Sequence, residues 1–186
     1  MHEVEVKAAL SDKEGVMRAL EERGCIFSAP LTENDTLYAL QVGDMESYNR
    51  NANFLRIRER SNGDIVFTLK HHPDRHEGRP DSMPLEHETT IGSKEEMEQA
   101  LLLMGYQEVV RTDKVRQKGR IGKWEVCVDD VEGLGSFIEL EELTDGKETQ
   151  RVIDEMLAFL AELGIARGDM FADRYDIALL KKRWGV

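Results

Sequence analysis

The stretch Glu3-Val4-Glu5-Val6-Lys7 opens the chain with a strict alternation of charged and apolar residues. A period of two is the pattern of a β-strand, because successive side chains of a strand point to opposite faces of the sheet. Glu3, Glu5 and Lys7 therefore share one face, and the two valines share the other. The stretch predicts a strand of a sheet that has one ionic face and one apolar face.

Charged alternation continues along the chain and keeps like charges together. The pairs are Glu3 with Glu5, Glu86 with Glu88, Glu139 with Glu141, Arg56 with Arg58, and Lys114 with Arg116. Like charges side by side on a sheet repel by roughly a few tenths of a kcal/mol, so a face that only meets solvent usually mixes signs. The grouping indicates a bound counter-charge at each pair, since divalent cations suit carboxylates and phosphate oxygens suit Arg and Lys. The pattern predicts a site for metal ions and a polyphosphate.

Helix signals lie between these strands. Capping boxes begin at Ser11 and Ser93, and Gly24 and Gly105 follow at the expected helix ends. We expect helices over residues 12–23, 94–104, 148–163 and 174–183, a hairpin of strands 124–129 and 137–143, and loops over residues 41–53 and 71–84. If the ionic faces converge inside a closed barrel, the first three helices cover the outward apolar faces. A charged interior then implies a water-filled tunnel that holds a ligand.

The composition narrows the class of protein. The chain of 186 residues carries a formal net charge of −12, and its length and lack of a clear linker fit a single domain over residues 1–186. Such a charge argues against a nucleic-acid polymer as partner, and no apolar run approaches the roughly 20 residues that span a bilayer. Cys25 and Cys127 sit among apolar neighbours without metal-ligand spacing. We expect a protein of the reducing cytoplasm that is not embedded in a membrane.

The motifs, taken in order, resemble those of the CYTH family, the triphosphate tunnel metalloenzymes. They are Glu3-x-Glu5-x-Lys7, Leu-Arg-Ile-Arg at residues 55–58, Thr-Leu-Lys at 68–70, Glu86-x-Glu88, Lys114-x-Arg116 and Asp129. The hairpin at residues 128–141 looks most like the class IV adenylyl cyclase branch, the CyaB-like proteins. The matches extend from residue 3 to about residue 180, and their number and order make the resemblance specific.

The resemblance implies an α+β fold, namely a closed eight-stranded antiparallel β-barrel or tunnel with a charged interior, surrounded by helices. It implies two Mg²⁺ or Mn²⁺ ions held by carboxylates from Glu3, Glu5, Glu86, Glu88, Asp129, Glu139 and Glu141. It also implies a triphosphate clamp of Lys7, Arg56, Arg58, Lys70, Lys114 and Arg116. Two departures stand out. Pro84 occupies a position where the family commonly has an arginine, for which Arg79 is a candidate substitute, and residues 174–180 match the family's Ser-Tyr-x-x-Leu-Leu only in part.

Three functions fit this set of residues. The hairpin favours a class IV adenylyl cyclase, which converts ATP to cyclic AMP and pyrophosphate. A thiamine triphosphatase or an inorganic triphosphatase of the same fold is the alternative, because the same ionic residues serve both reactions. A third interpretation is a non-catalytic protein that binds nucleotides or polyphosphate. A homodimer, common in the CyaB-like branch, is compatible with outward apolar strand faces.

Overall fold

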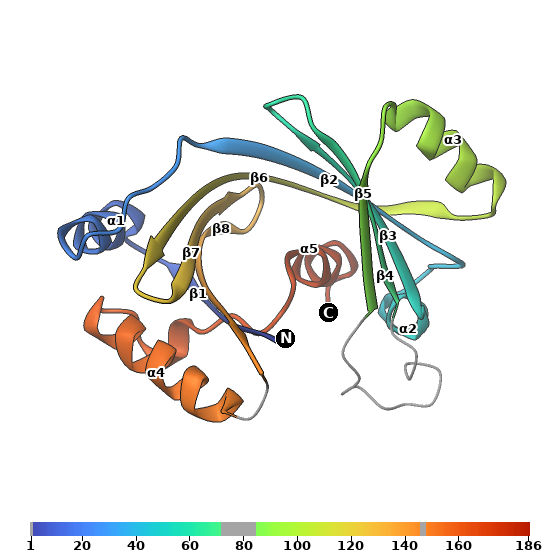
Figure 1. The fold of residues 1–186 in the computed structure, drawn as a ribbon. Coiled ribbons are helices and arrows are strands. Elements are labelled where there is room, and N and C mark those ends of the chain that lie inside the picture. The colour runs from blue at the N-terminus through green and yellow to red at the C-terminus, as the bar shows by residue number, and fades with distance from the viewer. Residues whose placement is uncertain (1, 72–84, 146–147) are drawn as a thin grey trace. The chain divides into compact units, whose positions relative to one another are not determined.

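In the part of the chain that the structure describes, the fold consists of eight strands and five α-helices (Figure 1). The structure, a computed structural model, describes residues 2–71, 85–145 and 148–186, with side chains from Val4 onward. The strands are β1 (His2–Leu10), β2 (Leu31–Ala39), β3 (Asn53–Arg60), β4 (Ile65–His71), β5 (Leu85–Thr90), β6 (Gln107–Ile121), β7 (Trp124–Val131) and β8 (Gly135–Thr144). The helices are α1 (Lys13–Glu22), α2 (Met45–Arg50), α3 (Lys94–Leu103), α4 (Thr149–Glu162) and α5 (Tyr175–Trp184), with a 3₁₀ turn η2 (Arg167–Asp169).

The strands form one antiparallel sheet in the order β1-β8-β7-β6-β2-β3-β4-β5. The predicted eight-stranded antiparallel sheet with helices is thereby confirmed. The pairing of the described residues runs from β1 to β5, and closure into a barrel remains a prediction. No helix in the described ranges is both long enough and apolar enough to cross a membrane.

Two compact units divide the chain. Unit 1 comprises Met1–Leu31 and Lys114–Asp173, and unit 2 comprises Thr32–Asp113 and Arg174–Val186. Strand β6 contributes residues 107–113 to unit 2 and residues 114–121 to unit 1. Each unit therefore has its own strands, its own covering helices and its own ionic face.

The core of unit 1 lies between the apolar face of its strands and two helices. The strands contribute Val4, Val6, Val126, Val128, Ile138 and Leu140, and the helices contribute Val16, Leu20, Val152, Met156 and Leu160. These strand residues alternate with the charged ones, so burying them leaves the charges on the opposite face. Helices α1 and α4 cover the apolar face, as the sequence predicted.

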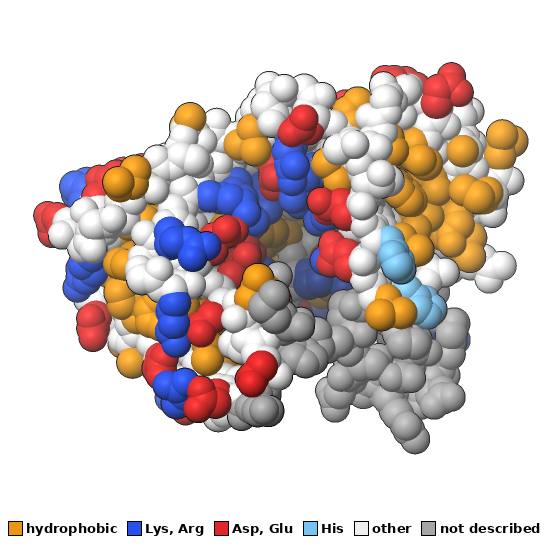
Figure 2. Space-filling view, viewed as in Figure 1, with side chains coloured by type: hydrophobic (Ala, Val, Ile, Leu, Met, Phe, Trp, Pro, Cys, Tyr) orange, Lys and Arg blue, Asp and Glu red, His pale blue; other side chains and the backbone are white. Residues whose placement is uncertain are grey.

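Unit 2 buries side chains on both faces of its strands. On one face, α3 packs Leu101 against Tyr38, Leu55 and Ile57, and Figure 2 shows hydrophobic side chains gathered between α3 and the strands. On the other face, a cluster that includes Phe54 and Leu180 joins α2 and α5 to the strands. That second cluster lies on the face that also carries the charged residues of β3, an arrangement the sequence did not predict.

Three local predictions need correction. The N-cap of α1 is Asp12 and not Ser11, because the Asp12 carboxylate accepts the Gly15 N–H at 2.9 Å. Residues 41–53, expected as a loop, contain α2, whose six residues are too few to show a periodic pattern. Strand β2 was not predicted. The N-cap at Ser93 and the hairpin of β7 and β8 are confirmed.

Candidate functional site

Unit 1 has an ionic face made of rows of residues that lie opposite one another on adjacent strands. Residues directly opposite in an antiparallel ladder place their side chains on the same face. The rows are Glu5–Glu141–Glu125, Lys7–Glu139–Cys127 and Phe137–Asp129–Arg116. On the side shown in Figure 2, basic and acidic side chains lie next to each other over these strands. The register thus brings together the charged residues of β1, β6, β7 and β8 that the sequence placed on one face.

Buried cations and carboxylates pair closely in two of these rows. The Arg116 guanidinium binds both oxygens of Asp129, at 2.6 and 2.5 Å, and also contacts Glu139. Lys114 Nζ lies 3.1 Å from Asp129 Oδ2, and Lys7 Nζ lies 2.9 Å from Glu139 Oε1. Asp129 is fully buried. A buried charge is tolerated only when it is paired in this way.

The pKa values of this cluster follow from the pairing. Burial opposes ionisation of the Asp129 carboxyl, but Arg116 and Lys114 outweigh it and hold the pKa below its ordinary value. Burial likewise opposes ionisation of Glu139, and Arg116 and Lys7 lower its pKa. Burial disfavours the Lys7 ammonium, yet Glu139 and Glu5 raise its pKa overall. All of these groups are therefore charged at neutral pH.

The row Glu5–Glu141–Glu125 offers the donors that a hard divalent cation prefers. Three carboxylates lie abreast on three strands, and ligand atoms of Glu125, Glu141 and Cys127 lie within 4.8 Å of one another. Carboxylate oxygens are the usual ligands of Mg²⁺, so these residues fit the ion that the sequence predicted. Glu139, also predicted as a ligand, pairs with Lys7 and Arg116, and its metal role stays a prediction.

A cavity of 530 Å³ in unit 1 adjoins this row. Its lining includes Glu125 and Glu141 together with the cations Lys118, Arg120 and Lys123. Lys118 pairs with Glu125 at 2.5 Å. Carboxylates beside half-exposed lysines can bind a cation together with the anionic group attached to it.

Unit 2 carries a second ionic face on β2, β3, β4 and β5. Asp35 lies opposite Arg58, which binds its carboxylate through two hydrogen bonds of 2.6 and 2.7 Å. Glu33 is nearly fully buried and pairs with both Arg58 and Arg60, at 3.1 Å each. Sequence reasoning missed these two carboxylates because their role depends on which residue of β3 faces them.

Arg56 is less well neutralised than its neighbours. Its Nη2 donates to Thr68 Oγ1 at 3.1 Å, but the nearest carboxylate oxygens, on Glu88 and Asp35, are 3.6 and 3.9 Å away. Its buried Nε has no hydrogen-bond partner in the part of the chain that the structure describes. Burial and the neighbouring Arg58 lower the pKa of this guanidinium. A cation with a buried donor that lacks an acceptor has capacity left to bind an anion.

Lys70 and the β5 carboxylates complete this face. Lys70 lies opposite both Phe54 and Glu86, and its Nζ is 3.1 Å from Glu86 Oε2. Thr68 lies opposite Glu88 and donates to it at 3.2 Å. The predicted residues Arg56, Lys70, Glu86 and Glu88 therefore lie together in unit 2.

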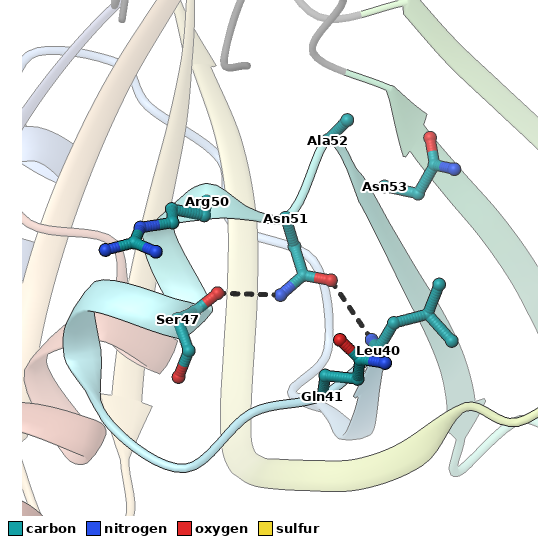
Figure 3. Close-up of a pocket in the computed structure, with 7 residues that line it drawn as sticks. All are labelled: Leu40, Gln41, Ser47, Arg50, Asn51, Ala52 and Asn53. Carbon is teal, nitrogen blue, oxygen red and sulfur yellow. Dashed lines mark hydrogen bonds between the residues drawn. The ribbon is translucent and has the colours of Figure 1, made fainter.

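A cavity of 340 Å³ in unit 2 lies between the end of β2, α2 and the start of β3 (Figure 3). The Asn51 side chain crosses it: its Oδ1 accepts the Leu40 N–H at 3.1 Å, and its Nδ2 donates to Ser47 O at 2.9 Å. Gln41 lines the cavity with φ = 51°, a left-handed conformation. These bonds fix α2 against the strands, which positions Tyr48 from the same helix.

The placement of other predicted residues is mixed. Glu3 belongs to β1, but its side chain lies outside the described residues, as do Arg79 and Pro84. Glu125 and Arg174 were not predicted. The alternation of β7 could have revealed Glu125, since it is two positions from Cys127 and four from Asp129. Both cysteines are free and buried, as expected.

Comparison with known proteins now identifies the family. The CYTH domain model matches residues 1–175. The chain belongs to the CYTH family. A candidate adenylate cyclase of Methanocaldococcus jannaschii is 30% identical over 176 residues, which cover 94% of this chain and 97% of that protein. Membership of this family, whose enzymes act on triphosphates, confirms the coarser part of the functional prediction.

Solved structures share the CYTH fold. The protein PH1819 of Pyrococcus horikoshii has a TM-score of 0.76 and 26% identity, covering 98% of this chain and 100% of that one. A candidate adenylate cyclase of Vibrio parahaemolyticus has a TM-score of 0.74 and 19% identity, covering 95% and 97%. HpAC1 of Hippeastrum, a candidate adenylyl cyclase with a dominant triphosphatase activity, has a TM-score of 0.65 and 20% identity, covering 99% and 96%.

Proposed function

We propose that this protein is a metal-dependent adenylyl cyclase that converts ATP to cyclic AMP and pyrophosphate. One observation carries the triphosphate part of this proposal, namely the partly exposed Arg56 guanidinium, whose buried Nε is unpartnered in the part of the chain that the structure describes. Such a group gains most from a multiply charged anion, because phosphate oxygens supply acceptors and charge together. Membership of the CYTH family supports the same ligand class.

Each ionic face carries groups that suit a metal ion or a phosphate chain. Glu5, Glu141 and Glu125 of unit 1 would hold Mg²⁺ or Mn²⁺, which, when bound, polarises phosphate oxygens and favours ionisation of a hydroxyl nucleophile. In unit 2, Arg56 and Lys70 would bind phosphate oxygens.

The reaction would be an in-line displacement at the α-phosphorus of ATP. The ribose 3′-oxygen forms a bond to the α-phosphorus and loses its proton to water, while the bond to the pyrophosphate oxygen breaks. Lys114 and Arg116 are held rigidly by Asp129. Groups fixed in this way stabilise developing charge without reorganising.

Two observations favour the cyclase. The hairpin of β7 and β8 matches the CyaB-like pattern in sequence, and the relative from Methanocaldococcus jannaschii carries the name of a candidate adenylate cyclase.

A triphosphatase is the second candidate, because the same fold in HpAC1 has a dominant triphosphatase activity. In that reaction water attacks the terminal phosphorus, the bond to the remaining diphosphate breaks, and orthophosphate is released. We also propose a cytoplasmic location, in keeping with the two free thiols.

Product analysis separates these functions. The pure protein is incubated with ATP and Mn²⁺, or with Mg²⁺, and the nucleotides and phosphates are resolved by ion-exchange chromatography, with an EDTA control. Cyclic AMP with an equal amount of pyrophosphate supports the cyclase. Orthophosphate release without cyclic AMP replaces it with the triphosphatase, and tight ATP binding without any product identifies a non-catalytic binding protein.

A further inference from the structure

Arg174 is a cation of unit 2 that begins the segment at residues 174–180, which matches the family pattern only in part, and the sequence predicted no role for it. It immediately precedes α5, and its Nε and Nη2 donate to the two carboxylate oxygens of Asp176 at 3.0 and 2.5 Å. Nη2 also lies 3.4 Å from the Tyr48 hydroxyl, which itself donates to Asp176. Asp176 and Tyr48 are both buried. Two enclosed polar groups thus fix one edge of the guanidinium.

The other edge of Arg174 is open. The side chain is 39% exposed, and its Nη1 makes no hydrogen bond to any residue that the structure describes. The guanidinium carbon lies 5.2 Å from the centre of the Phe54 ring, a distance typical of a cation–π contact. The Asp176 carboxylate and the Phe54 ring together hold the Arg174 guanidinium in one orientation, and its Nη1 donors stay available.

Phe54 connects Arg174 to the ionic face of unit 2. It is two residues before Arg56 on β3, so both side chains lie on the same face about 6.6 Å apart along the strand. Lys70 of β4 lies opposite Phe54. Through its contact with Phe54, Arg174 lies on the same face of unit 2 as Arg56 and Lys70. This is the face on which the Arg56 Nε lacks an acceptor among the described residues.

We propose that Arg174 is a further substrate-binding residue, whose open edge donates hydrogen bonds to an oxygen of the phosphate chain that Arg56 and Lys70 bind. Asp176 and Tyr48 are positioning residues, because they act only through Arg174. This inference rests on the proposed triphosphate-binding function. The planar guanidinium fork suits phosphate oxygens better than an ammonium group does.

A purely structural role makes a different prediction. In that case Arg174 would only dock α5, much as Arg183 does by donating Nη1 to Val109 O at 2.6 Å. Arg183 belongs to the same helix but pairs with a backbone carbonyl, so Arg183→Ala is a matched control for the docking of α5.

Calorimetric titration with inorganic triphosphate tests the inference, in Mg²⁺ and again in EDTA. Arg174→Ala should raise the dissociation constant about tenfold or more, as expected for a lost hydrogen bond to a charged group. Arg183→Ala should lower the melting temperature while leaving the dissociation constant within twofold of the parent. If Arg174→Ala does not fold, Arg174→Lys keeps a cation beside Asp176 and should still weaken binding several-fold.

Unchanged affinity in the folded Arg174 variants would overturn the inference and leave Arg174 a docking residue, while parent binding would still support the proposed function. A parent that binds no triphosphate under either condition would overturn both. A Tyr48→Phe variant with weakened binding and a small loss of stability would support its positioning role. The same variant with parental affinity would remove that role.

Discussion

Asp129 shows how single residues define the ionic face of unit 1. The sequence placed it there by alternation, but its bonds to Arg116 and Lys114 depend on strand register, which one sequence does not reveal. The same holds for Glu33 and its two arginines in unit 2. The two-residue alternation predicts which residues of a strand share a face. Which residues of neighbouring strands pair can be determined only from the structure.

Replacing Asp129 tests the strength of this pairing. Asp129→Asn leaves two buried cations without their carboxylate, so we expect the free energy of unfolding at pH 7 to fall by about 3 kcal/mol. Asp64→Asn is a control, because Asp64 lies in an exposed turn. Chemical denaturation of both variants measures the difference, and equal stabilities would contradict the account.

The pH dependence of stability follows from the same carboxyl. Its pKa is lower in the folded protein than the ordinary 3.8, so its contribution is complete above the unfolded value and is lost as pH falls through the folded value. Melting temperatures of the parent should therefore drop as pH falls below about 4. Asp129→Asn should show a shallower acid dependence, and parallel curves would argue against the depressed pKa.

Glu141 lies at the centre of the carboxylate row and is the sharpest test of metal binding. Glu141→Gln should lower metal-dependent turnover at least about 100-fold while the fold is retained, because an amide is a weaker ligand for a hard cation. Glu162→Gln is the control, since Glu162 is an exposed residue at the end of α4. Metal-dependent activity measured across Mn²⁺ concentrations distinguishes them. Parental activity of Glu141→Gln would remove this residue from the metal role.

At the scale of elements, periodic patterns predicted most of the fold. Five charged strands, the hairpin and four helices follow from periods of two and 3.6 residues and from capping signals. Strand β2 was not predicted because it buries Thr36 on one face and Glu33 and Asp35 on the other, so its sequence does not alternate between polar and apolar residues. Helix α2 escaped because six residues are too short for a pattern.

The start of α1 provides a paired test of capping. Asp12→Ala removes the acceptor of the Gly15 N–H and should cost about 1 kcal/mol of stability. Ser11→Ala should change stability by less than about 0.5 kcal/mol, because Ser11 is exposed and precedes the cap. Thermal unfolding of the two variants decides between the residues. A larger loss of stability for Ser11→Ala than for Asp12→Ala would support Ser11 as the N-cap, as the sequence predicted.

Strand β6 passes unusually close to Cys25 at Gly119. A Cβ at this position would lie 2.5 Å from the Cys25 sulfur and 3.2 Å from the Ile26 carbonyl oxygen. Gly119→Ala should therefore destabilise the protein by about 1–3 kcal/mol through overpacking. Adding Cys25→Ala should recover part of that loss, so the double variant should be more stable than the two separate losses predict. Strictly additive losses, measured by urea denaturation, would rule out the close contact as the cause.

At the scale of the whole molecule, ordered motifs were enough to identify the family. Six short patterns along the chain pointed to the CYTH family, and the match over residues 1–175 confirms it. The single-domain organisation, barrel closure and a homodimer remain predictions, because each depends on contacts that alternation within strands does not encode. The choice between cyclase and triphosphatase also depends on how a substrate lies, which residue types alone do not determine.

The ionic faces and the family membership together predict that the protein uses metal ions to act on a triphosphate. Phosphorus NMR of the pure protein with Mg²⁺ and ATP, and separately with Mg²⁺ and inorganic triphosphate, follows every phosphate group directly. We predict that at least one triphosphate is consumed over time, that the loss stops when EDTA is added, and that Glu141→Gln abolishes it. If both triphosphates stay intact with folded protein in excess Mg²⁺, and again after exchange to Mn²⁺, the result contradicts metal-dependent action on a triphosphate.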